Sequence, residues 1–300
     1  MKFRDSYHLY ALITIILFAL TFVLTRMALR YFSAFSLSFL RFFIASCTLI
    51  PMVIFKKMHL PKREDIKWFL ASGTSGFSLY MIAFNVGSKT VSATTTSVII
   101  ATVPVITVIF ARVFYKEKLK VFQWAAIAVE FSGVVVITVL KGGFSVNIGI
   151  LWLLAAVALY SVYNLLQRKL TQTYSALQIT AYSIFVGTII MSVFIQQSVQ
   201  EIKTAPPEQI LYILILGVFC GAVAYFTWTT AFEKAANTSS VTNYMFLAPF
   251  LTGVLGIVMA GEAVDSPTII GGMIIMAGVL IFNFGGKISI RSISERTSND

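Results

Sequence analysis

Two long apolar segments of this chain share identical residues at a fixed spacing of 145 positions. The first runs from Gly87 to Lys118, with a proline near its middle and a lysine and glutamate cluster at its end. The identities that recur at this spacing are Lys89 and Lys234, Pro104 and Pro249, Glu117 and Glu262, Gly133 and Gly278, Gly76 and Gly221, and Tyr80 and Tyr225. Several of these residue types are rare in apolar sequence, so chance is a poor explanation. We predict two copies of one structural unit.

The composition predicts a membrane protein. Hydrophobic residues make up 58% of the 300 positions and charged residues only 12%, whereas soluble domains carry about a quarter charged residues. A helix needs roughly 17 to 25 apolar residues to cross a bilayer. Runs of this kind are expected at residues 9–30, 34–55, 66–86, 91–114, 121–140, 149–170, 175–197, 209–231, 236–260 and 267–286. The predicted fold is an all-α integral membrane protein with about ten transmembrane helices.

The repeat and the helices together predict an inverted architecture. Each copy holds five helices, an odd number, so the second copy enters the membrane with the opposite orientation to the first. The predicted divisions are residues 1–140 for the first repeat, 141–148 for a short linker, 149–286 for the second repeat and 287–300 for a cytoplasmic tail. Such a pair can pack in two nearly equivalent ways, each open to one side, with a substrate site near the midplane. This architecture favours a carrier over a receptor, an enzyme or a scaffold.

Basic residues predict the orientation. If the N-terminus is cytoplasmic, most lysines and arginines lie on inner flanks, as the positive-inside rule requires. Both termini are then cytoplasmic, in a multi-pass protein of the cell (inner or plasma) membrane. A cleaved secretory signal fits less well than an uncleaved first helix, because no small-residue cleavage site precedes Arg26. The net charge of +11 is spread over all cytoplasmic loops, so nucleic acid is not a predicted partner.

No motif for catalysis or for a cofactor stands out. The only histidines are His8 and His59, and no spacing matches a zinc ligand set or a P-loop. Cys47 and Cys220 both lie inside apolar runs, which is typical of small buried residues. The chain is predicted not to be an enzyme, to hold no cofactor or metal, and to work without ATP.

At this point the residues resemble a known family, the EamA-type transporters of the drug/metabolite transporter superfamily. The resemblance is carried by Ala93 through Pro104 to Glu117-Lys118-Leu119, by Ser239-Ser240-Val241 through Pro249 to Gly261-Glu262, and by Leu40-Arg41-Phe42. It spans about residues 9 to 286. Where the family often has a Trp-Gly pair in the first helix, this chain has Phe18-Ala19, with Thr21 following. The resemblance implies a ten-helix carrier, commonly an exporter of amino acids, other metabolites or toxic compounds, with its fifth and tenth helices peripheral to a central cavity.

The candidate cavity residues are polar or aromatic side chains within predicted helices, namely Thr21, Tyr80, Asn164, Tyr225, Trp228 and Asn243. A tyrosine hydroxyl in hydrocarbon needs a partner, and Trp228 lies one helical turn beyond Tyr225. The tyrosines would otherwise be interfacial anchors, and the asparagines would otherwise join two helices by hydrogen bonds.

Two prolines and two ionisable residues complete the candidates. Pro104 and Pro249 each remove a backbone donor within a helix, which fits either a gating kink or a packing kink. Glu130 lies near the predicted midplane as a possible proton-coupling group, although its repeat mate is Ile275 and the resemblance places its helix at the periphery. There it would stay neutral or support a dimer contact. Arg41 would either brace helices or bind an anionic group.

These observations predict a secondary carrier, an exporter or facilitator of small metabolites such as amino acids, that works by alternating access between two inverted halves. Its partners would be a small-molecule substrate and the lipid bilayer, and both a monomer and a homodimer fit. The alternative is a non-transporting structural or interaction protein of the same fold, and a membrane-embedded enzyme comes third.

Overall fold

A computed structural model describes residues 7–115, 121–142, 147–234, 241, 243–278 and 280–281, and within these ranges all regular structure is helical. The first repeat contains α1 (Tyr7–Ala28), α2 (Ala34–Phe55), η2 (Arg63–Asp65), α3 (Ile66–Gly73), η3 (Thr74–Ser78), α4 (Leu79–Ser88), α5 (Ala93–Ile100), α6 (Val103–Tyr115) and α7 (Val121–Gly142). The second contains α8 (Ile148–Leu170), α9 (Ala176–Met191), η4 (Ser192–Phe194), α10 (Ile195–Lys203), α11 (Pro207–Gly217), η5 (Val218–Val223), α12 (Ala224–Lys234), η6 (Asn243–Leu247), α14 (Ala248–Ala260) and a last helix, Ser266–Gly278.

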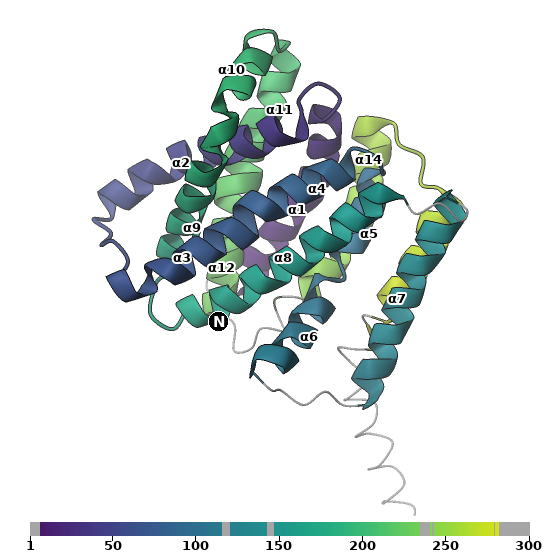
Figure 1. The fold of residues 1–300 in the computed structure, drawn as a ribbon. Coiled ribbons are helices and arrows are strands. Elements are labelled where there is room, and N and C mark those ends of the chain that lie inside the picture. Colours follow the sequence, from purple (N-terminus) through teal and green to yellow (C-terminus); the bar gives the residue numbers. More distant parts are fainter. Residues whose placement is uncertain are drawn as a thin grey trace, which may run out of the picture.

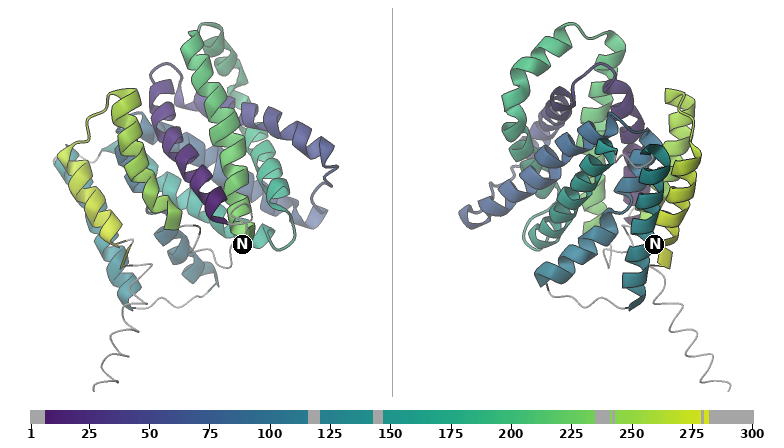
Figure 2. Two further views of the ribbon diagram at one scale, coloured as in Figure 1. Left: turned by 180° about the vertical axis from the view of Figure 1, so that it is seen from behind. Right: turned by 45° about the vertical axis from the view of Figure 1, so that its right-hand side comes forward.

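Several of these helices are long and apolar enough to cross a membrane. They are Tyr7–Ala28, Ala34–Phe55, Ile148–Gln167, Ala176–Lys203 and Pro207–Lys234, and shorter apolar helices accompany them. The long helices lie side by side in one bundle, and α7 stands at its edge beside the last helix (Figures 1 and 2). The all-α membrane fold predicted from the sequence is confirmed.

Local capping begins several helices where the sequence predicts them. Ser33 and Ser92 accept hydrogen bonds from backbone amides in the first turns of α2 and α5, and Ser175 forms a capping box with Gln178 at α9. A side-chain acceptor at this position satisfies an amide that the helix itself leaves free. Pro207 begins α11, where the missing amide hydrogen costs no helical bond.

Two details of the predicted helices are wrong. The span 91–114 is divided, because Ala101 and Thr102 form a turn between α5 and α6. The helix predicted to end at residue 197 instead continues, because α10 extends to Lys203. Apolar residues at positions 195, 199 and 202 recur at helical spacing, and the side chain of Glu201 accepts a hydrogen bond at 3.0 Å from the amide of Ser33 in the α1–α2 loop.

The two repeats share an unusual local feature, a π-helical turn in the third helix of each. The amide of Leu79 donates to the carbonyl of Thr74 within η3, and that of Ala224 donates to Phe219 within η5. Both bonds span five residues, and they lie 145 positions apart. The turn η3 packs on α9, and η5 packs on α2, so each π turn contacts the second helix of the other repeat. Such turns occur often at functional sites.

The contact between α7 and the last helix also follows the repeat. A Cβ atom on Gly133 would lie 2.6 Å from Cγ1 of Ile275, and one on Gly278 would lie 2.6 Å from Cγ of Glu130. Glycine at both positions therefore lets the two backbones approach closely.

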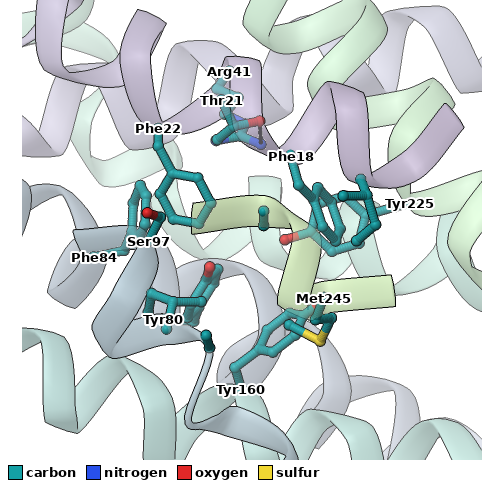
Figure 3. Close-up of a pocket in the computed structure, with 14 residues that line it drawn as sticks. Phe18, Thr21, Phe22, Arg41, Tyr80, Phe84, Ser97, Tyr160, Tyr225 and Met245 are labelled. Carbon is teal, nitrogen blue, oxygen red and sulfur yellow. Dashed lines mark hydrogen bonds between the residues drawn. The ribbon is translucent and has the colours of Figure 1, made fainter. Parts of the chain in front are cut away.

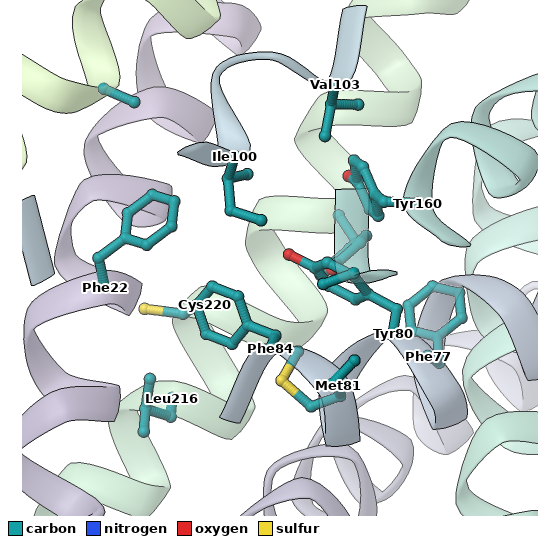
Figure 4. Close-up of a cluster of buried hydrophobic side chains, with 14 of the residues drawn as sticks. Phe22, Phe77, Tyr80, Met81, Phe84, Ile100, Val103, Tyr160, Leu216 and Cys220 are labelled. Atoms are coloured by element: carbon teal, nitrogen blue, oxygen red, sulfur yellow. The ribbon is translucent and has the colours of Figure 1, made fainter. Parts of the chain in front are cut away.

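Aromatic side chains gather in the centre of the bundle. Figure 4 shows Tyr80 of the third helix beside Tyr160 of α8, with Phe77 of the third helix and with Cys220 and Leu216 of the second repeat in the same cluster. The ring centroids of Tyr80 and Tyr160 are 4.8 Å apart, and those of Phe42 and Phe77 are 5.1 Å apart. Aromatic pairs at these distances stabilise the packing beyond their buried area.

Candidate functional site

A narrow cavity lies at the centre of the bundle, between the two repeats (Figure 3). Helices α1, α2, α4, α5, α8 and α12 contribute to its wall, together with η6 and α14. Six aromatic rings dominate the lining, namely Phe18, Phe22, Tyr80, Phe84, Tyr160 and Tyr225. The cavity has a volume of about 30 Å³. That space suits water, whereas pockets for small organic ligands measure about 300–1,000 Å³. The cavity is therefore in a contracted form here.

Repeat-related residues line this cavity in pairs. Ile15 and Tyr160, Tyr80 and Tyr225, and Ile100 and Met245 are three pairs of lining residues that each differ by 145 positions. The two halves thus supply equivalent surfaces to one wall. The tyrosine members add hydroxyl groups to a mainly apolar lining, so the cavity offers aromatic faces with a few polar groups.

Arg41 is the charged member of the lining. Its side chain is 2% exposed, and its Nη2 donates to the carbonyl of Cys220 at 2.9 Å and to Oγ1 of Thr21 at 3.5 Å. Its Nη1 approaches the sulfur of Met81 at 3.8 Å, and its Nε has no hydrogen-bond partner in the described part of the chain. The bond to Cys220 ties α2 to η5. Arg41 thus braces the two repeats against each other through this hydrogen bond.

A second, wider space of about 560 Å³, which we call the vestibule, is lined by Arg26 in the last turn of α1, by Thr90, Val91 and Ser92 before α5, and by Glu262 after α14. Glu262 lies on its wall because Gly261 ends α14 with a φ of 62°, a conformation that suits glycine. The carboxylate of Glu262 is 3.7 Å from Nε of Arg26 and accepts a hydrogen bond at 3.0 Å from the amide of Ala93. Arg26 also donates to the carbonyl of Ser88. These bonds join α1, α4, α5 and α14.

The vestibule and the cavity are separated by about one helical turn. Arg26 lies four residues beyond Phe22, Ser88 four beyond Phe84, and Ala93 four before Ser97, where the second residue of each pair lines the cavity. The Glu262 contacts therefore lie about one helical turn from the cavity, on its vestibule side.

The structure brings some of the predicted cavity residues together and not others. Thr21, Tyr80 and Tyr225 lie on the cavity wall. Trp228 lies outside that wall, with its ring centroid 5.8 Å from that of Phe18. Asn164 also lies outside it, and its Nδ2 is 3.5 Å from Oγ1 of Thr107 in α6, a contact between helices. Asn243 begins η6, but its side chain is outside the described residues, as are residues 143–146 of the predicted linker and the tail 287–300.

Each candidate proline lies at the start of a helix, where the sequence predicted mid-helix positions. Pro104 is the second residue of α6, directly after the turn at Ala101 and Thr102, and Pro249 is the second residue of α14, after the 3-10 turn η6. A proline is well accommodated there because the first helical turn does not need its amide hydrogen. Ala101 and Ala248, beside these starts, line the cavity, so a change of the turns would change the cavity wall.

Glu130 lies away from the cavity, in α7. It is 2% exposed, and both carboxyl oxygens lack a hydrogen-bond partner among the described residues. Its Cγ faces Gly278 of the last helix. The peripheral position expected for this helix agrees with the position of α7 in Figure 1.

Sequence reasoning missed several lining residues, including Phe22, Phe84, Tyr160 and Met245. The repeat spacing did not identify Tyr160, because its mate in the first helix is Ile15, an apolar residue that the sequence does not distinguish. Sequence reasoning also missed the contacts that Glu262 makes between helices. A glutamate at a helix end is expected to be solvated, and only the fold places Arg26 and Ala93 beside it.

A bundle of apolar helices built from two repeats around a closed central cavity is the architecture of membrane transporters. A family model described as the EamA-like transporter family matches residues 5–139 and again residues 147–284, and the chain belongs to this family.

Curated relatives agree with the family. The chain is 29% identical over 266 residues to "Uncharacterized transporter YdfC" of Bacillus subtilis, covering 88% of this chain and 86% of the relative. It is 28% identical over 271 residues to the "Probable terminal-alkyne amino-acid exporter" of Streptantibioticus cattleyicolor, covering 90% and 91%. It is 23% identical over 254 residues to an "S-adenosylmethionine uptake transporter" of Rickettsia bellii, covering 85% of each. A protein of known crystal structure shares the fold with a TM-score of 0.64 at 18% identity, over 92% of this chain and 96% of that one.

Proposed function

We propose that this protein is a secondary carrier that moves a small organic solute through the central cavity by alternating access. The observation that supports this most directly is the cavity wall, to which both repeats contribute equivalent residues such as Tyr80 and Tyr225. A site shared by two inverted halves can be opened to either side by a movement of one half against the other. The contracted cavity corresponds to a state between the two open ones.

The contacts of Glu262 support a specific closing element. We infer that the Arg26 pair and the bond to the Ala93 amide hold the vestibule side shut in this state. Opening this side would break these contacts while leaving the helices intact. With the orientation that the basic residues predict, the vestibule faces the outside of the cell, and both termini face the cytoplasm.

The solute class that we favour is amino acids and similar metabolites. One relative is named as an amino-acid exporter and another as an uptake transporter, so relatives of similar coverage are named for opposite directions. A carrier with two accessible states runs down whichever gradient is supplied, and direction is then a property of the cell. The driving force would be a solute or ion gradient without ATP, and one chain supplies the whole cavity whether it acts as a monomer or as a homodimer.

The first test is flux into liposomes that contain only the purified protein. A labelled panel of amino acids, nucleosides and organic cations would be offered with and without an imposed pH gradient. We expect saturable uptake of amino acids above that of protein-free liposomes. Absence of flux for the whole panel would contradict the carrier and favour a structural or interaction protein of the same fold, whereas acceleration by the pH gradient would indicate proton coupling.

The second test concerns the vestibule closure. A cysteine placed at Tyr80, in a chain with Cys47→Ala and Cys220→Ala, would report access to the cavity by its reaction with a small polar thiol reagent. Adding Glu262→Ala should speed labelling from the vestibule side several-fold, because it removes both the ion pair and the bond to the Ala93 amide. The matched control is Glu208→Ala on α11, which lies outside the vestibule wall. Equal labelling with and without Glu262 would contradict this closing role.

A further inference from the structure

The guanidinium of Arg41 is a buried cation with no anionic partner in the described part of the chain. Among the described residues, no carboxylate lies within ion-pair distance of it, and the described ion pair of the chain joins Arg26 to Glu262. Three ionisable groups that interact with Arg41, those of Tyr80, Tyr225 and Cys220, are neutral when protonated. The described wall of the cavity therefore carries one positive charge and no negative charge.

The hydrogen bonds of Arg41 leave part of its donor set free. A guanidinium has five N–H donors. One of them makes a bond of normal length, to Cys220, while Thr21 is at the 3.5 Å limit and Met81 offers only a weak sulfur acceptor. The Nε donor has no partner. Because burying a charged group is costly unless it is paired and hydrogen-bonded, these free donors favour the entry of an anion.

The surroundings indicate what the rest of that anion looks like. Figure 3 shows Arg41 and Thr21 together on one side of the cavity, with the rings of Phe18, Phe22, Tyr80 and Tyr225 around the remaining space. A ligand that fills this space would place one charged end at the guanidinium and an apolar body against the rings. Arginine binds a carboxylate with two parallel hydrogen bonds, which gives both affinity and orientation.

We propose that Arg41 is the substrate-binding residue for a carboxylate, so that the transported solutes are organic carboxylates with an apolar or aromatic body. Amino acids with large apolar side chains belong to this class, and organic cations and uncharged nucleosides do not. This inference rests on the proposed function, because it takes the cavity as the substrate site. The contact with Cys220 fixes the guanidinium in place, and the solute carboxylate binds to its remaining donors when the cavity widens.

A binding experiment with matched probes tests the charge preference. Purified protein in detergent would be equilibrated by dialysis with labelled 3-phenylpropionate, with its uncharged amide and with phenethylamine. These three share a phenyl ring and two methylene groups and differ in the end group, which is anionic, uncharged or cationic. We expect the carboxylate to bind at least about tenfold more tightly than the amide, as a charge-assisted bidentate bond predicts. Equal affinity for carboxylate and amide, or preference for the amine, would overturn the proposal.

Variants assign the preference to Arg41. Arg41→Gln should remove the discrimination between carboxylate and amide, and Arg41→Lys should keep part of it. The control is Arg30→Gln, which changes an exposed arginine that approaches the carbonyl of Ala260 at 3.5 Å. This variant should leave the discrimination unchanged. Discrimination retained by Arg41→Gln would overturn the proposal. If that variant does not fold, the three-probe comparison on the unaltered protein still decides the charge preference.

Flux measurements separate this proposal from the carrier function itself. Saturable flux of an uncharged or cationic solute, without flux of carboxylates, would keep the carrier and overturn the role of Arg41. Absence of all flux would contradict the carrier, while the dialysis result would still decide whether Arg41 binds carboxylates.

Discussion

The two repeats have equivalent backbones but different buried charges. Their π turns lie 145 positions apart, and each packs on the second helix of the other repeat. At the position equivalent to Arg41, however, the second repeat has Val186, which packs against Gly73. At the position equivalent to Glu130 it has Ile275, which packs against Gly133. Both of these buried ionisable side chains, Arg41 and Glu130, therefore belong to the first repeat.

This difference separates two requirements on the sequence. Two nearly equivalent packings require that the backbones match, and the repeated glycines and π turns provide that match. Binding one particular solute requires only one set of polar groups in the shared cavity. The second repeat can then use apolar side chains at the same positions, where they stabilise the bundle. The following predictions test this division, in order of decreasing effect.

The largest effect is expected when the second repeat is given a glutamate at position 275, which is equivalent to Glu130 in the first repeat. Ile275→Glu would bury a second carboxyl group in the contact between α7 and the last helix, where Ile275 is fully buried. Burying a polar group without a hydrogen-bond partner costs about 3 kcal/mol, so the thermal unfolding midpoint in detergent should fall clearly. Ile275→Val, which removes one methylene group, should cost only about 1 kcal/mol. Similar midpoints for the two variants would show that this contact tolerates charge in either repeat.

The sequence predicts the helices of this fold well, for a simple physical reason. A bilayer requires apolar runs of a fixed length, and such runs can be counted without tertiary information. The interruptions are harder to foresee. No local sequence pattern marks the turn at Ala101 and Thr102. In the first π turn, the ring of Tyr163 occupies the place that a Cβ atom on Gly76 would take, a contact that only the folded structure reveals.

The candidate site was predictable in part. Tyr80 and Tyr225 were identified because the repeat spacing joins them, and both line the cavity. Trp228 shares the helix of Tyr225 but lies outside the wall, since helical periodicity alone cannot fix which face meets the cavity. Phe22 and Phe84 resemble ordinary membrane aromatics in sequence. Only the packing of α1 against α4 and α5 distinguishes them.

A second, smaller effect is expected because the two π turns differ in how much room they leave for a Cβ atom on their glycines. A Cβ on Gly76 would overlap Cδ2 of Tyr163 and lie 2.5 Å from its Cγ, whereas a Cβ on Gly221 would lie 3.1 Å from that of Ala45. Gly76→Ala should therefore lower stability by about 2 kcal/mol, because the buried ring must move. Gly221→Ala should cost less than about 1 kcal/mol. Unfolding midpoints of the paired variants in one detergent measure this, and equal losses would contradict the difference in packing.

A third comparison concerns the starts of the second helices. Ser175 caps α9 within a capping box, and Ser33 caps α2. Replacing either by alanine removes a bond to a first-turn amide and should cost about 1 kcal/mol. In Ser175→Ala, the side chain of Gln178 can still accept from the backbone amide of residue 175. Gln178→Ala should therefore lower the free energy of unfolding by a few tenths of a kcal/mol at most. A stability loss as large as that of Ser175→Ala would show that the two residues of the capping box act as one unit.

The smallest effect is expected for Glu130→Gln. This change keeps the size of the side chain, and Glu130 lies on α7 facing Gly278, away from the cavity wall. If the first repeat supplies solute chemistry through Arg41 alone, saturable flux should change less than about twofold, and any response to a pH gradient should persist. The matched variant is Arg41→Gln, for which carboxylate flux should fall by tenfold or more, as expected for loss of a charge-assisted bidentate bond. Loss of the pH response in Glu130→Gln, with flux otherwise retained, would instead assign proton coupling to Glu130. In the first repeat, Arg41 would then bind the solute and Glu130 would bind the coupling proton. The second repeat, with Val186 and Ile275 at the equivalent positions, would bind neither.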